Sequence, residues 1–226
     1  MDHTLDQASE DLWVFGYGSL IWRPGFDYVE RVPAHTIGLH RSLCVYSFDH
    51  RGTPERPGLV LGLDFGGACR GICYRVTAKK RPATLTYLRD REQTTAVYRE
   101  MMRSVWLSGS PERHVDALCY VVDRGHPQYA AGLTHDKQLH IVRQARGRSG
   151  ANRDYVLETA KALEALNIVD HELQVLAARL GGGVTRLRGA VTRTGRPRCA
   201  ARRSMRASAW CSVGRSGRTS RSSIRS

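Results

Sequence analysis

The chain has 226 residues, with 35 Lys and Arg against 21 Asp and Glu, and a formal net charge of +14. No run of about 18 apolar residues occurs, which excludes a membrane-spanning helix. The first residues are acidic, which argues against a signal peptide, and we therefore expect a cytoplasmic protein. Because the 12 Arg of residues 184–226 carry most of the charge, residues 1–183 are nearly neutral at +2 and do not have the composition of a nucleic-acid-binding domain.

The first predicted strand is the continuous apolar run Leu12–Phe15, which is typical of a buried strand. It leads into the segment Gly16–Leu20, whose two glycines permit backbone angles that other residues avoid. A second strand is predicted over residues 39–48, where apolar and polar residues alternate.

The middle of the chain predicts a hairpin and then a helix. Residues 59–63 and 69–76 both favour strands, and Gly66-Gly67 between them is a turn signal. A helix is expected to begin at Pro82 and to run to about Asp90, since proline is common in the first turn of a helix.

The remaining elements change from strands to helices. Residues 95–107 and 115–122 are predicted strands, and three helices are expected to begin near Thr134, Asn152 and Asp170. Strands come first and helices mostly last, which favours an α+β fold over a doubly wound sheet.

The last predicted segment is a tail rather than a folded element. Residues 184–226 are rich in Arg, Ser and Gly and poor in large apolar residues, so they cannot bury enough surface to offset the entropy cost of ordering. We expect a loose arm over residues 1–11, one domain over residues 12–183, and a disordered tail that is either a native arm or out-of-frame, non-native sequence. Any nucleic-acid binding through this tail would be non-specific.

The cysteines do not form a metal-binding or redox motif. No C-x-x-C pair and no His–Cys cluster with zinc spacing occurs, so neither a zinc site nor a redox pair is predicted. The four cysteines before residue 184 are interpreted as reduced, buried apolar residues.

The glycine segment is the sharpest chemical feature. Gly16-x-Gly18 follows a strand, but a dinucleotide fingerprint would place its third glycine at position 21, which is Ile21. The segment therefore predicts either a plain tight turn or a loop whose N–H groups hold a carboxylate or an oxyanion.

Three further residues are candidates for the site. Glu92 follows the helix predicted from Pro82 and could face a cleft, although a solvated helix end is the more common role for such a charged run and Glu100 is a competing carboxylate. Arg51 lies in a polar loop between strands. Tyr155 lies on an apolar helical stripe, where a core aromatic is the alternative.

Five segments together resemble a known family. Val14-Phe15-Gly16-Tyr17-Gly18-Ser19-Leu20-Ile21-Trp22 is similar to the N-terminal signature of the ChaC family of γ-glutamylcyclotransferases. The other similar segments follow in the family's order over about residues 12–180: Asp49-His50-Arg51-Gly52 with Pro57-Gly58, Gly71-x-x-Tyr74-Arg75, Leu88-x-x-Arg91-Glu92, and Asp123-x-x-His126-Pro127-x-Tyr129 with Ser149-Gly150-x-Asn152-x-x-Tyr155. Ordered matches are far more specific than any one motif. The segment after Glu92 lacks the glycine that often precedes the tyrosine in the family.

The resemblance implies a compact mixed β-barrel with flanking helices. It implies a lyase that converts glutathione to 5-oxoproline and Cys-Gly without a metal or cofactor, with Glu92 as catalytic base and acid. The implied substrate-binding residues are Val14, Phe15, Gly16, Tyr17, Gly18, Ser19, Leu20, Arg51 and Tyr155. Three alternatives stay open: a cyclotransferase for other γ-glutamyl amines, a catalytically silent regulatory protein linked to cation transport, and an RNA- or membrane-surface binder acting through the tail.

Overall fold

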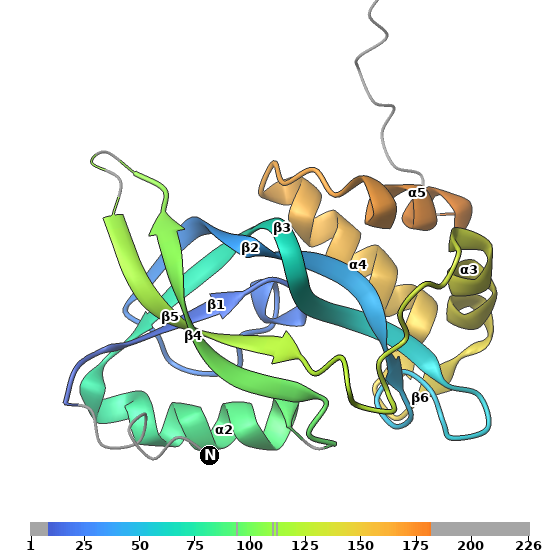
Figure 1. The fold of residues 1–226 in the computed structure, drawn as a ribbon, viewed down its shortest axis with the longest axis horizontal. Coiled ribbons are helices and arrows are strands. Elements are labelled where there is room, and N and C mark those ends of the chain that lie inside the picture. The colour runs from blue at the N-terminus through green and yellow to red at the C-terminus, as the bar shows by residue number, and fades with distance from the viewer. Residues whose placement is uncertain (1–8, 94, 110, 112, 182–226) are drawn as a thin grey trace, which may run out of the picture. The chain divides into compact units, whose positions relative to one another are not determined.

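A closed barrel of five strands forms the centre of the molecule (Figure 1). The computed structural model describes residues 9–181 apart from residues 94, 110 and 112, and all of these lie in a compact unit spanning Met1–Thr185. The strands are β1 (Leu12–Gly16), β2 (Glu30–Ser47), β3 (Gly58–Val76), β4 (Tyr98–Leu107) and β5 (Arg113–Val122). The predicted α+β barrel is confirmed, whereas the predicted tail over residues 184–226 lies outside the described residues.

Helices flank the barrel on two sides, as Figure 1 shows for α2 on one side and for α3, α4 and α5 together on another. The α-helices of the described residues are α2 (Arg81–Glu92), α3 (His135–Gln144), α4 (Asn152–Ala165) and α5 (His171–Arg179). The predicted starts at Thr134 and Asp170 are confirmed, because each side chain accepts a hydrogen bond from a backbone amide three residues later. None of these helices has the length and apolar character needed to cross a membrane.

Strand β1 is buried on both faces, which explains its continuous apolar sequence. It pairs antiparallel with β3 and parallel with β5. Val14 packs in the hydrophobic cluster that reaches α2, whereas Phe15 packs in the larger cluster that reaches the other helices. Because both side chains have 0% exposure, the loop that follows β1 starts from a fixed point between the two clusters.

The predicted hairpin at Gly66-Gly67 is wrong. Residues 58–76 form one strand, β3, and both halves of it pair with β2 rather than with each other. The pairing shifts register between Ile37↔Ala68 and Leu39↔Phe65, and the two glycines absorb this bulge with φ angles of 105° and 66°. The glycines therefore bend a long barrel strand instead of reversing the chain.

Candidate active site

A cavity of about 360 Å³ opens where the end of β1, the start of β3, the end of α2 and the start of α4 meet. Each of the five strands contributes a polar or apolar side chain to its lining, either from the strand itself or from a residue next to its end, as expected for a ligand site in a barrel. Its lining consists of Tyr17, Gly18, Ser19, Leu20, Trp22, Arg23, Ser47, His50, Arg51, Val60, Leu61, Tyr87, Asp90, Arg91, Glu92, Tyr98, Tyr120, Arg148, Ser149 and Tyr155.

The glycine segment leaves β1 and enters a single 3₁₀ turn, η1 (Ser19–Ile21). The turn is closed by a hydrogen bond of 3.0 Å from the Ile21 amide to the Gly18 carbonyl. Among the described residues, the amides of Gly18 and Ser19 donate to no acceptor, because the first N–H groups of a helical turn have no partner within it. Both residues line the cavity, so their amides are available to an anionic group bound there.

Arg91, the last residue but one of α2, connects this loop to α2. Its Nη2 donates to Ser19 Oγ at 2.9 Å, and its Nη1 donates to the carbonyl oxygens of Arg23 and Pro24 at 2.6 and 3.2 Å. Its Nε lies 3.0 Å from Glu92 Oε1. One planar guanidinium therefore fixes the position of the Glu92 carboxylate relative to the glycine loop.

Glu92 ends α2 and lies in the cavity wall with a side chain that is 16% exposed. Burial raises the pKa of this carboxyl above its ordinary value, and the attraction of Arg91 offsets only part of the shift. A carboxylate with a raised pKa accepts a proton more readily, which suits a group that must take up a proton and return it.

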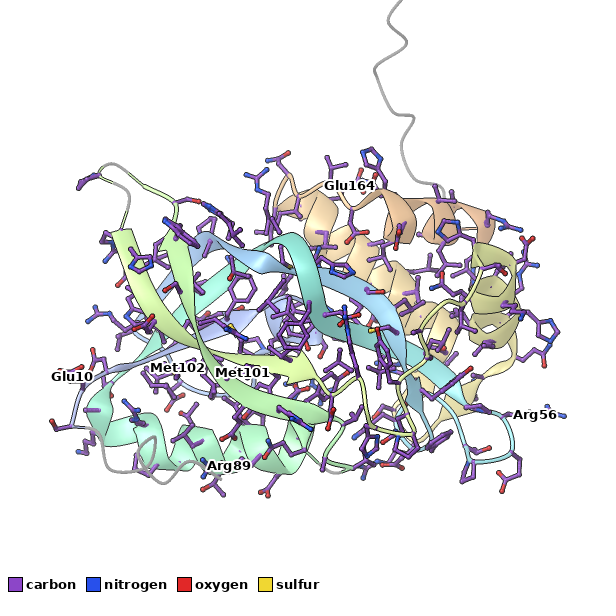
Figure 2. The ribbon with its side chains drawn as sticks, viewed as in Figure 1. Glu10, Arg56, Arg89, Met101, Met102 and Glu164 are labelled. Carbon is purple, nitrogen blue, oxygen red and sulfur yellow. The ribbon has the colours of Figure 1, made fainter. Side chains whose placement is uncertain are left out.

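The competing carboxylate, Glu100, is committed to another partner. Arg89 on α2 (Figure 2) donates two hydrogen bonds of 2.9 and 3.1 Å to the Glu100 carboxylate, and Tyr120 OH donates a third at 3.2 Å. Glu100 does not line the cavity. The geometry therefore favours Glu92 as the carboxylate that can meet a bound molecule.

Five tyrosines line the cavity, and their hydroxyl groups contact the protein. Tyr17 OH donates to the Tyr120 carbonyl at 2.9 Å, and Tyr98 OH donates to the Leu61 carbonyl at 2.7 Å. Tyr155 differs, because its oxygen accepts from the Leu61 amide at 3.1 Å and keeps its own proton free for a ligand. Burial raises the pKa of Tyr155 to about 12, so that proton is retained at neutral pH.

The rim of the cavity carries several basic side chains near α4. The Arg51 guanidinium lies 5.4 Å from the centre of the Tyr155 ring and donates to the Ala151 carbonyl at 3.3 Å. Arg148 pairs with Asp49 at 2.7 Å. The Arg51 and Arg148 guanidinium groups therefore line the same cavity as Glu92, and Asp49 offsets the charge of Arg148.

A family model described as ChaC-like protein matches residues 12–181 of this chain. The chain belongs to the ChaC-like family. It is 31% identical over 165 residues to the glutathione-specific γ-glutamylcyclotransferase of Escherichia coli K12, covering 73% of this chain and 71% of that protein. It is 34% identical over 181 residues to the protein of the same name from Schizosaccharomyces pombe, covering 73% of this chain and 88% of that protein.

A solved structure shows the same fold. The crystal structure of a yeast γ-glutamylcyclotransferase specific to glutathione superimposes with a TM-score of 0.71 at 24% identity, covering 76% of this chain and 96% of that one. The mixed barrel described above is therefore the fold of a ChaC-like protein. Among the described residues, no group of three or more His, Cys, Asp or Glu side chains is placed to hold a metal ion.

The structure brings together most of the site residues predicted for a ChaC-like protein. Seven of them line the cavity: Tyr17, Gly18, Ser19, Leu20, Arg51, Glu92 and Tyr155. Val14, Phe15 and Gly16 do not, because they belong to β1, where the two side chains are fully buried between strands. These three residues anchor the start of the glycine loop and do not line the cavity.

Sequence reasoning about this ChaC-like chain did not single out Arg91, Tyr98, Tyr120 or Arg148 as site residues. Arg91 had a signal, since it immediately precedes Glu92 in the matched segment. Tyr98 had a signal only in the family resemblance, where it is the tyrosine of the segment after Glu92. Tyr120 had none, because it occurs within an otherwise ordinary strand and reaches the cavity only through closure of the barrel.

Proposed function

We propose that this chain is a glutathione-specific γ-glutamylcyclotransferase that converts glutathione to 5-oxoproline and Cys-Gly. The observation that carries the proposal is a buried carboxylate of raised pKa, Glu92, which lines the same cavity as a glycine loop with free backbone amides. Relatives named glutathione-specific γ-glutamylcyclotransferase are 30–34% identical over 70–73% of this chain.

The reaction is an internal acyl transfer that needs a base but no protein nucleophile. The α-nitrogen of the γ-glutamyl group forms a bond to its own γ-carbonyl carbon, and the bond from that carbon to the cysteine nitrogen breaks. Glu92 removes one proton from the α-ammonium group to free the attacking amine, and the ring nitrogen loses a second proton as the lactam forms. The departing cysteine nitrogen gains two protons, one from Glu92 as its bond to carbon breaks and one from solvent, and leaves as the ammonium group of Cys-Gly, so the protons balance. A cavity that folds the glutamyl chain brings nitrogen and carbonyl together, an effect that intramolecular reactions exploit strongly.

The glycine loop supplies the second requirement of this reaction. As the lactam closes, the γ-carbonyl oxygen gains negative charge, and fixed N–H donors stabilise that charge best in a site with little water. The amides of Gly18 and Ser19, together with Leu20, are the donors that we assign to the oxyanion or to the substrate carboxylate. The free proton of Tyr155 can serve the same group, because a Cβ at Gly18 would lie only 3.7 Å from Tyr155 OH.

The basic rim supports glutathione over smaller γ-glutamyl amines. Glutathione carries a second carboxylate on its glycine, distant from the reacting carbonyl. Arg51 and Arg148 line the cavity at its mouth, where such a carboxylate would lie when the glutamyl group is near Glu92. A γ-glutamyl amine without that carboxylate makes no use of these side chains.

The test is incubation of the purified chain with glutathione, γ-glutamylcysteine and a γ-glutamyl amine, with 5-oxoproline and the released amine quantified. We expect turnover of glutathione and a much lower kcat/KM for the two shorter compounds. Equal rates for all three would replace glutathione specificity by general cyclotransferase activity. Binding of glutathione without any 5-oxoproline would instead identify a silent binding protein.

A further inference from the structure

A buried arginine lies behind the glycine loop and outside the cavity lining. Arg41 on β2 has a side chain that is only 4% exposed. Its Nε donates to the Tyr17 carbonyl at 2.5 Å and its Nη2 to the Arg70 carbonyl at 2.5 Å, while its Nη1 pairs with Asp170 Oδ2 at 3.0 Å. All three nitrogens of the guanidinium are therefore engaged, and one of them holds the loop that the proposed reaction uses.

The bond to Tyr17 controls the direction of a neighbouring amide. The Tyr17 carbonyl and the Gly18 N–H belong to one planar peptide unit, and in a trans peptide they point in opposite directions. Arg41 lies on the carbonyl side, outside the cavity lining, whereas Gly18 itself lines the cavity. A charged donor on the carbonyl also polarises the peptide and strengthens the N–H as a donor.

We infer that Arg41 is a positioning residue that holds the Tyr17–Gly18 peptide with its N–H directed into the cavity, toward the oxyanion of the cyclisation. The inference rests on the proposed function, because it assigns that amide to the reacting carbonyl. Arg41 touches no reacting atom, and it acts through the backbone of Tyr17 and Gly18.

The ion pair between Arg41 and Asp170 offers a matched control. Asp170 also caps α5, since its Oδ1 accepts from the Leu173 amide at 3.1 Å. Asp170→Asn removes the charge of the pair but keeps an efficient helix cap and leaves the Arg41 bond to Tyr17 in place. If Arg41 served stability alone, substitutions of Arg41 and of Asp170 would change kcat/KM to a similar extent. If Arg41 acts through Tyr17, only the substitution of Arg41 lowers kcat/KM.

The experiment compares Arg41→Lys with Asp170→Asn in the full chain, using steady-state kinetics with glutathione and the ¹⁵N resonance of the Gly18 amide. Lysine keeps the charge but cannot serve all three acceptors of Arg41. We expect Arg41→Lys to lower kcat/KM about 10- to 100-fold and to shift the Gly18 resonance. For Asp170→Asn, we expect kcat/KM and the Gly18 resonance to stay near their wild-type values. The acid limb of the pH–rate profile should not move, because Glu92 owes its pKa to burial and to Arg91.

The outcomes separate this inference from the proposed function. An active wild-type protein with unchanged kcat/KM in folded Arg41→Lys overturns the role of Arg41 alone, as does an equal loss in Asp170→Asn. A wild-type protein without turnover overturns both. If Arg41→Lys does not fold, Arg41→Gln provides a second test, since its uncharged amide can still donate to one carbonyl.

Discussion

Replacing Glu92 by glutamine is expected to abolish most turnover while making the protein more stable. Glutamine keeps the size of the side chain and its place at the end of α2, but it cannot accept a proton from the substrate ammonium group. A positioned general acid–base group typically contributes about 10²–10⁴-fold to the rate. We expect a loss of that size in kcat, with a smaller change in KM, because the cavity wall is otherwise intact.

The gain in stability follows from the environment of Glu92. Burial raises its folded-state pKa above the unfolded value, so the fold favours the protonated form, and stability is lost as pH rises through the folded-state pKa. A pKa that differs by one between the folded and unfolded states changes the free energy of unfolding by about 1.4 kcal/mol. A change of about 1 kcal/mol in that free energy moves the Tm of a domain of 150–250 residues by roughly 2–4 °C. Glutamine resembles the protonated acid, so Glu92→Gln is expected to have a higher Tm than wild type at pH 7.5 and an equal Tm near pH 4.

The assay is 5-oxoproline release together with thermal unfolding at several pH values, with Glu100→Gln as the matched control. Glu100 is held by Arg89 and lies outside the cavity, so its replacement should lower stability and leave turnover largely intact. Wild-type kcat/KM should rise with pH as Glu92 ionises. Full turnover in Glu92→Gln, with loss in Glu100→Gln, would refute the reasoning, as would a Glu92→Gln protein that is less stable than wild type at pH 7.5.

Three further predictions concern metals, the glycine loop and the tail. Turnover should survive EDTA and thiol alkylation, because lactam closure needs neither and the cysteines of the described residues are buried; a loss with EDTA that one metal restores would contradict this mechanism. Gly18→Val should abolish glutathione binding while Gly18→Ala keeps part of it, since a Cβ there meets Leu61 and Tyr155 OH at an ordinary 3.7 Å and only larger groups fill the cavity; unchanged affinity in Gly18→Val would make the loop a plain turn. Truncation after Gly183 should leave turnover intact, and a collapse of activity would show that residues 184–226 belong to the working domain.

Much of the fold could be predicted because local signals determine it. The helix starts at Thr134 and Asp170 follow from side chains that cap backbone amides, and β1 follows from an apolar run that is short enough for a strand. The bend at Gly66-Gly67 could not be separated from a hairpin, because both need glycines with positive φ. The difference is whether the flanking strands pair with each other or with β2, and that is a property of the closed barrel.

The site was predictable where a motif carries its chemistry within a few residues. Glu92 and the Gly16–Leu20 segment could be identified in this way. The contribution of Tyr120 could not, and the motif does not show what Tyr98 contacts, since its hydroxyl donates to the carbonyl of Leu61, 37 residues earlier in the chain. Arg41 illustrates the same limit, because its partners Tyr17 and Asp170 lie 24 and 129 residues away.

The pattern of occupied groups explains why this cavity suits a reaction that needs one base. Tyr17 and Tyr98 donate their hydroxyl protons to backbone carbonyls, and burial raises the pKa of both well above the ordinary value, so neither is a ready nucleophile or base. Burial likewise raises the pKa of Cys44 to about 12, and that thiol does not line the cavity. Glu92 is then the cavity carboxylate whose pKa burial raises above its ordinary value. An internal acyl transfer, in which the substrate supplies its own nucleophile, needs little more than this carboxylate and the amides of the glycine loop in the same cavity.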